Sequence, residues 1–142
     1  MATATTAPVL FPWKDDYSVN IGIIDSQHRT LVDLLNELHQ AMMTGKGKDQ
    51  VGIVLSKLVK YAQGHFKSEE GMMQSKQYPE FEDHKVEHDR FTKTVLEFQG
   101  KFARNEIGLT SEVMDFLKTW LMKHIMGVDK KYSPFLNSKG VY

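Results

Sequence analysis

Apolar residues recur every three or four positions along four stretches of the chain, and polar residues fill the positions between them. This spacing places the apolar side chains on one face of an α-helix. The pattern predicts four helices, over about 26–44, 49–73, 79–102 and 111–128. The short polar connections between them favour an antiparallel order. We therefore expect an all-α protein built as an up-down-up-down antiparallel four-helix bundle.

The two ends of the chain lack this period. Residues 1–12 are rich in alanine and threonine and contain two prolines, which predicts a loosely ordered, extended N-terminal arm. The apolar residues of 13–24 follow no helical spacing, so we expect an extended segment packed along the bundle. Asp25 and Ser26 are typical N-cap residues and are expected to start the first helix. After Pro134 we expect a short coil on the bundle end.

The composition limits the classes of function. A length of 142 residues suits one domain with a substantial core, which we assign to residues 13–142. Lysine plus arginine and aspartate plus glutamate both number 18, so the net charge is zero and no nucleic-acid partner is expected. The absence of cysteine excludes disulfides and cysteine-ligated metal clusters. No signal peptide and no long apolar run is recognisable, which predicts a cytoplasmic protein without a membrane span.

Histidines occupy the apolar faces of all four predicted helices. Two pairs, His65 with Glu69 and His84 with His88, are four residues apart, and that spacing places both members on the same face of a helix. Burying an imidazole without a partner costs roughly 1–3 kcal/mol, and a shared metal centre would satisfy all of the imidazoles at once. The candidate imidazole ligands are His28, His65, His84, His88 and His124.

The ligand set is too large for one zinc ion. Five imidazoles and the Glu69 carboxylate exceed the four ligands of a zinc site, which favours a dinuclear centre of iron or manganese bridged by carboxylates. Asp129 is the candidate second carboxylate, but it follows His124 by five residues and would lie about 140° away from it on a regular helix. A π turn removes this offset. We therefore expect an irregular helix between Ile125 and Asp129, made easier by Gly127.

Other metal-binding patterns fit the chain less well. The spacing of His84 and His88 resembles that of a zinc-protease helix, but Lys85 stands where such a helix has its glutamate base. Ferritin-like di-iron proteins need histidines that follow a glutamate by three residues, and no histidine here does so. The charged residues around Glu69, including Glu70, are predicted to form a solvated face.

Four motifs of the chain resemble those of the hemerythrin family. They are Asp25-x-Gln27-His28-x-x-Leu31, His65-Phe66-x-x-Glu69, His84-x-x-x-His88 and Trp120-Leu121-x-x-His124-Ile125-x-x-x-Asp129. The resemblance extends from Trp13 to about Tyr132, and all seven ligand positions of the family carry the expected residue type. It implies two iron ions bridged by an oxo or hydroxo group, Glu69 and Asp129. One iron would be held by His84, His88 and His124, and the other by His28 and His65.

By the same resemblance, the chain would bind dioxygen reversibly at the iron held by two histidines. It would act as an oxygen carrier, store or deliverer rather than as an enzyme, with an oxygen-consuming enzyme as a candidate recipient. Two alternatives stay open: an oxygen or redox sensor module, and a di-iron redox enzyme acting on peroxide or nitric oxide. No signalling domain follows the fourth predicted helix, which favours carriage over sensing.

Apolar residues flank the candidate ligands in the sequence. They could form a dry pocket that admits dioxygen and keeps water away from it, although plain core packing would explain the same pattern. The expected pocket residues are Leu31, Phe66, Trp120, Leu121 and Ile125.

Overall fold

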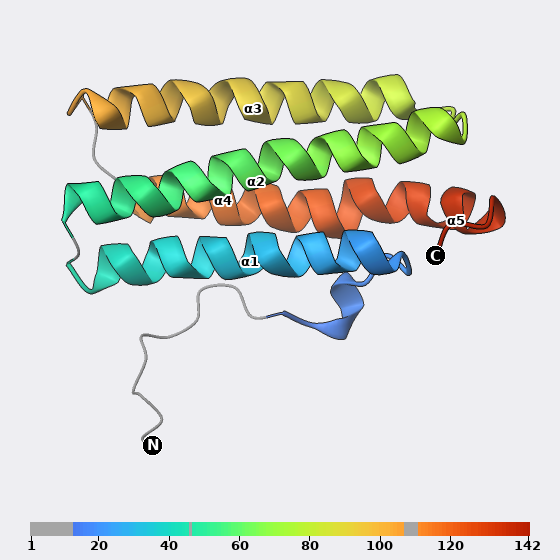
Figure 1. Ribbon diagram of the computed structural model, residues 1–142, viewed down its shortest axis with the longest axis horizontal. Coiled ribbons are helices and arrows are strands. Elements are labelled where there is room, and N and C mark those ends of the chain that lie inside the picture. The colour runs from blue at the N-terminus through green and yellow to red at the C-terminus, as the bar shows by residue number, and fades with distance from the viewer. Residues whose placement is uncertain (1–12, 46, 107–110) are drawn as a thin grey trace, which may run out of the picture.

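Four long helices lie side by side in antiparallel order (Figure 1). They are α1 (Gly22–Met43), α2 (Lys48–Ser75), α3 (Phe81–Ala103) and α4 (Ser111–Lys123). The computed structural model describes residues 13–45, 47–106 and 111–142. The predicted all-α four-helix bundle is confirmed. None of the helices in this part of the chain is long and apolar enough to cross a membrane.

The first helix begins earlier than the sequence predicted. α1 starts at Gly22, so the prediction of an N-cap at Asp25 or Ser26 is wrong, and the backbone N–H of Asp25 already donates to the carbonyl of Ile21. The Asp25 carboxylate instead accepts hydrogen bonds from the backbone N–H of Val19 at 2.8 Å and from the Ser18 hydroxyl at 2.6 Å. These bonds fasten the preceding segment to the first turn of the helix.

The segment before α1 is not fully extended. A short 3₁₀ helix, η1 (Asp15–Tyr17), interrupts it, and Tyr17 is buried against the bundle. The segment then turns at Asn20, which has a φ of 58°. The predicted arm at 1–12 lies outside the described residues.

The chain stays helical past Pro134 as far as Ser138, where a coil was predicted. The π-helix η2 (His124–Asp129) leads directly into α5 (Lys130–Ser138), which lies at the end of the bundle where α1 begins (Figure 1). α5 contains Pro134, whose missing N–H and bulky ring destabilise a helix by about 3 kcal/mol. Tyr132 and Leu136 are fully buried, and burial of two such side chains offsets that cost.

Apolar side chains pack in two separate clusters. The larger one follows the four helices along the bundle, and the smaller one joins the segment before α1, the end of α2 and α5. On α1, Ile24 belongs to the smaller cluster and Leu31 to the larger one. On α2, Met73 belongs to the smaller cluster and Phe66 to the larger one. His28 and Glu69 lie between these pairs and His65 directly precedes Phe66, so this part of the bundle forms a layer of candidate ligands between the two clusters.

The role of Asp25 at the start of α1 can be tested by substitution. Asp25→Ala should lower the free energy of unfolding by about 1–2 kcal/mol, because the N–H of Val19 and the Ser18 hydroxyl lose their acceptor. Urea unfolding followed by circular dichroism measures the change. Asp33→Ala, which removes an exposed carboxylate from the same helix, should change the free energy by less than about 0.5 kcal/mol. Equal effects of the two substitutions would contradict the role of Asp25.

Candidate metal centre

All seven candidate ligands meet in the layer between the two apolar clusters. They come from α1 (His28), α2 (His65 and Glu69), α3 (His84 and His88) and η2 (His124 and Asp129). None of the seven is more than 4% exposed. Their nitrogen and oxygen atoms form two overlapping groups, and within each group the atoms lie within 4.8 Å of one another. The first group contains His28, His65, Glu69, His124 and Asp129, and the second contains Glu69, His84, His88, His124 and Asp129.

The two carboxylates lie at the centre of this cluster. Glu69 Oε1 is 3.2 Å from His65 Nε2, 3.1 Å from His88 Nε2 and 3.1 Å from His124 Nε2. Asp129 is also surrounded by three imidazoles. Its carboxylate oxygens lie 2.6 Å from His28 Nε2, 2.9 Å from His124 Nε2 and 3.1 Å from His84 Nε2. Both carboxylates belong to both groups of ligand atoms, which is the arrangement that two bridging carboxylates require.

The π-helix brings Asp129 to the same face as His124. The predicted irregularity before Asp129 is confirmed, since residues His124–Asp129 form a π-helix. A wider turn makes a spacing of five residues share a face, whereas an α-helix would separate the two side chains by about 140°. Gly127 has no positive φ, and a Cβ atom placed on it would meet nothing within 4 Å. The turn therefore does not depend on glycine at this position, contrary to our expectation.

Several buried atoms in the cluster have no hydrogen-bond partner and are suited to binding a cation. The Nε2 atoms of His65, His84 and His88 and one oxygen of Asp129 are buried without a hydrogen-bond partner, although each lies near a group of opposite character. Such orphaned atoms, turned toward a common centre, are the atoms that a bound cation would satisfy. Imidazole and carboxylate together suit iron. The residues present therefore fit a di-iron centre.

The electrostatics of the cluster also indicate a site for cations. Burial by itself would lower the pKa of His65, but the Glu69 and Asp129 carboxylates outweigh burial and raise it from 6.5 to about 10. The pKa of His84 is raised to about 9 by the same two carboxylates, again against burial. Burial would raise the pKa of Glu69, but the surrounding imidazoles hold it well below its usual range. The centre therefore favours positive charge, whether carried by protons or by metal ions.

Three hydrogen bonds reach the cluster from residues behind it. His65 Nδ1 lies 2.7 Å from Gln27 Oε1, and His88 Nδ1 lies 2.9 Å from Glu70 Oε2. The buried hydroxyl of Tyr132, on α5, donates to the second oxygen of Glu69. The prediction that Glu70 lies on a solvated face is wrong, because its carboxylate faces His88 from the neighbouring helix. Tyr132 was missed because it lies beyond the predicted end of the last helix at about residue 128; on a continuing helix, its place three residues after Asp129 would have indicated the same face.

Aromatic rings hold two of the imidazoles in place. The Phe66 ring stacks on His88 with a centroid distance of 4.0 Å, and the Trp120 ring stacks on His124 at 4.7 Å; both pairs are within 13° of parallel. Phe91 in turn stacks on Trp120 at 3.7 Å. These contacts restrict rotation of the two imidazole rings.

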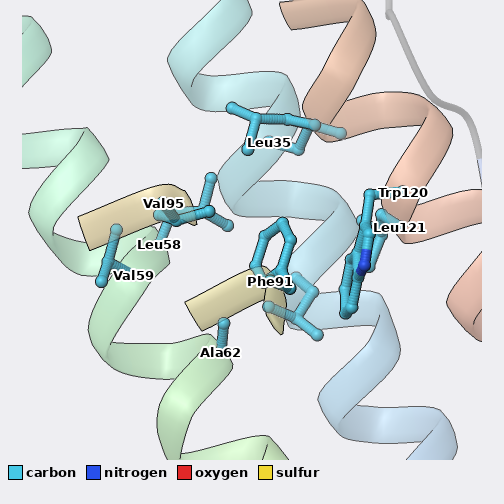
Figure 2. Close-up of a pocket in the computed structure, with 10 residues that line it drawn as sticks. Leu35, Leu58, Val59, Ala62, Phe91, Val95, Trp120 and Leu121 are labelled. Carbon is cyan, nitrogen blue, oxygen red and sulfur yellow. The ribbon is translucent and has the colours of Figure 1, made fainter. Parts of the chain in front are cut away.

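A narrow apolar cavity lies between the helices (Figure 2), and Trp120, which lines it, stacks on the candidate ligand His124. Its volume, measured as the space open to the centre of a water-sized sphere, is about 20 Å³, which is enough for one small molecule. It is lined by Leu31, Leu35, Leu58, Val59, Ala62, Phe91, Val95, Leu117, Trp120 and Leu121. Three of the five expected pocket residues are among these. The other two, Phe66 and Ile125, belong to the surrounding core instead.

Comparison with known proteins identifies the family. The model of the hemerythrin HHE cation binding domain matches residues 19–136. The chain belongs to the hemerythrin family. The bacteriohemerythrin of Methylococcus capsulatus is 38% identical to it over 87% of this chain and 93% of that protein. The myohemerythrin of Theromyzon tessulatum is 29% identical over 88% of this chain and 92% of its own length.

A solved structure shows the same fold. The crystal structure of a wild-type hemerythrin is 38% identical in sequence and superposes with a TM-score of 0.85, over 89% of this chain and 98% of that one. The hemerythrin relationship accounts for the donor set described above, since the family binds cations at a di-iron centre.

The contribution of the π-helix to the centre can be tested by changing its length. Insertion of one alanine after Gly127 should lengthen the spacing from His124 to Asp129 to six residues, turn Asp129 by roughly 100° away from the cluster and lower metal binding below two ions per chain. Gly127→Ala keeps the length and has open space for its Cβ, so it should still bind two ions. Metal analysis after iron loading gives the stoichiometry, and circular dichroism checks the helix content. Two ions bound by the insertion variant would contradict the role of the π-helix.

Proposed function

We propose that this hemerythrin binds dioxygen reversibly at a non-haem di-iron centre and serves as an oxygen carrier, store or deliverer. The observation that carries the proposal is the pair of shared carboxylates, Glu69 and Asp129, at the centre of two groups of histidine ligands. An apolar cavity supports it, because one of its lining residues, Trp120, stacks on His124. The names of the relatives, bacteriohemerythrin and myohemerythrin, support it as well.

The proposed ligand roles follow the two groups of atoms. His84, His88 and His124 would hold one iron, which matches the second group, and His28 and His65 would hold the other. Glu69, Asp129 and an oxo or hydroxo group would bridge the two irons. When bound, the two iron ions supply the electrons that dioxygen takes up on binding and returns on release. The protein's own part is to orient the ligands and to control water and protons around them.

Exclusion of water is the first of these tasks. The cavity is lined by aliphatic and aromatic side chains, and the indole N–H of Trp120 is the one hydrogen-bonding group among them, which is too few to hold a water molecule in place. Leu31 follows His28 by three residues, and Leu121 precedes His124 by three, so each lines the cavity about one helical turn from a candidate ligand. A small apolar molecule can occupy this space at little cost, whereas water and protons are disfavoured.

Tyr132 lies on the side of the cluster opposite the cavity, and its hydroxyl keeps its proton. Burial, together with the Asp129 and Glu69 carboxylates, raises the pKa of its hydroxyl well above 10.0. The hydroxyl therefore stays protonated and donates to Glu69, which orients this carboxylate. Because its hydrogen is engaged with Glu69, it is not free to protonate a ligand.

These features favour binding over turnover. Turnover of peroxide would need a proton donor beside the bound molecule, and the side chains that line the cavity carry no acidic or basic group. A sensor would use the same binding chemistry, so carriage and sensing are separated by partners rather than by the site. Residence in the cytoplasm and delivery to an oxygen-consuming enzyme stay predictions from the sequence.

An optical titration tests the function directly. Iron-loaded protein, reduced with dithionite, is exposed to air and then purged with argon. A visible absorption band should form in air and disappear on purging, over repeated cycles. A band that forms once and bleaches irreversibly would contradict reversible carriage and would favour redox turnover.

The apolar barrier can be tested at Leu121. Leu121→Ala should increase the rate at which the oxygenated protein oxidises irreversibly by several-fold, because the space left by the side chain lets water approach His124. Decay of the oxygenated absorption band in air measures the rate. Leu117→Ala enlarges the same cavity one helical turn farther from His124 and should have a smaller effect. Equal rates in Leu121→Ala and the unmodified protein would rule out the barrier.

A further inference from the structure

The two halves of the metal centre differ in the groups that stand behind their histidines. Glu70 Oε2 accepts a hydrogen bond from His88 Nδ1 at 2.9 Å, and Gln27 Oε1 accepts one from His65 Nδ1 at 2.7 Å. In both rings the other nitrogen, Nε2, faces the Glu69 carboxylate and is the one left to bind a metal. The acceptor is thus an anionic carboxylate in one half and a neutral amide in the other.

The two acceptors differ in their surroundings. The Gln27 amide nitrogen donates to the Ser68 hydroxyl at 3.2 Å, so the amide oxygen is the atom that faces His65. The Glu70 side chain is 19% exposed and His88 is 1% exposed. The Glu70 charge therefore acts on a ring that water does not screen.

Among the described residues, the other histidines do not repeat this arrangement. The Nδ1 atoms of His28 and His124 are buried without a hydrogen-bond partner. Of the ligand histidines with a side-chain acceptor on Nδ1 in this part of the chain, His88 has the charged one. The asymmetry between the two halves is therefore one of charge as well as of histidine number.

A carboxylate behind a ligand histidine strengthens metal binding. It draws the Nδ1 hydrogen toward itself, which makes Nε2 a stronger donor, and it adds a negative charge close to the cation. Removing such a partner typically lowers metal affinity by 10–100-fold. The bridging carboxylates, Glu69 and Asp129, are common to both halves, so the first cation neutralises them and repels the second. Binding is thereby separated into a tight step and a weaker step.

We propose that Glu70 makes the half formed by His84, His88 and His124 the tighter metal site, so that it fills first. The half formed by His28 and His65, which the proposed function assigns to dioxygen, is completed second and loses its metal first. The proposal rests on that assignment of the ligands. It makes Glu70 a positioning residue that sets the order of metal loading through His88.

Titration of the chelator-stripped protein with Co²⁺ tests the order of loading. Calorimetry gives the affinity of each step, and the visible absorption of Co²⁺ reports its ligands after one equivalent. The unmodified chain should bind two ions in two resolved steps. Glu70→Gln keeps an oxygen for the His88 hydrogen bond and removes only the charge, so it should weaken the first step by about 10–100-fold and leave the second unchanged.

Two further variants serve as matched controls. Gln27→Glu places the same charge behind His65 and should strengthen the second step, which brings the two affinities closer together. Glu97→Gln removes an exposed carboxylate from α3 and should change neither step. Thermal unfolding of the metal-free Glu70→Gln chain should match that of the unmodified chain, and its one-equivalent Co²⁺ absorption spectrum should differ.

The outcomes separate the loading order from the function on which it rests. The proposal is overturned if Glu70→Gln lowers the affinity of only the second binding step, or of neither step. It is also overturned if the unmodified chain binds both ions with one common affinity. Binding of a single Co²⁺ by the unmodified chain would instead contradict the dinuclear centre itself, and with it the proposed function. Two tight ions with a Glu70-independent order would leave the dinuclear centre standing and remove only the role of Glu70.

Discussion

Two carboxylates buried among five histidines are the constraint on which the rest of this structure depends. An isolated buried carboxylate is so unfavourable that it would take up a proton. Glu69 and Asp129 avoid this because each has three imidazole nitrogens within 3.2 Å. The imidazoles come from different helices, so every helix must place its histidine at the same depth. The layer of ligands thereby sets the register of the whole bundle.

Separation of polar and apolar layers follows from that register. The larger apolar cluster lies on one side of the ligands and contains the narrow cavity, and the smaller cluster closes the other side. Water is therefore kept from the ligands on both sides by largely apolar packing, and Tyr132 of the smaller cluster directs its hydroxyl at Glu69. A low local dielectric strengthens each imidazole–carboxylate contact in between. The apolar packing that stabilises the fold also excludes water from the ligands, which reversible oxygen binding needs.

The π-helix and α5 also contribute to the metal centre and to its apolar surroundings. The wider turn rotates Asp129 into the cluster without ending the helix, and the helix that continues brings Tyr132 over Glu69. Ser133, the next residue, donates to the carbonyl of Val19 and joins α5 to the segment before α1. A proline inside α5 is tolerated because these contacts and the burial of neighbouring side chains outweigh its local cost. The C-terminal helix is thus part of the metal centre rather than an appendage to it.

The sequence by itself determined the four helices and the seven candidate ligands, including the π turn before Asp129. These are local properties: a period of 3.6 residues, pairs four residues apart, and one spacing of five that only a wider turn can accommodate. Only the tertiary structure decided the start of α1, the helical form of the tail, the position of the cavity and the partners of His88 and Glu69. Glu70 lies in a run of charged residues that is equally compatible with solvent, and Tyr132 follows what looked like the end of the last helix. Their roles arise from contacts between elements distant in the sequence, and no local spacing encodes which surfaces will meet.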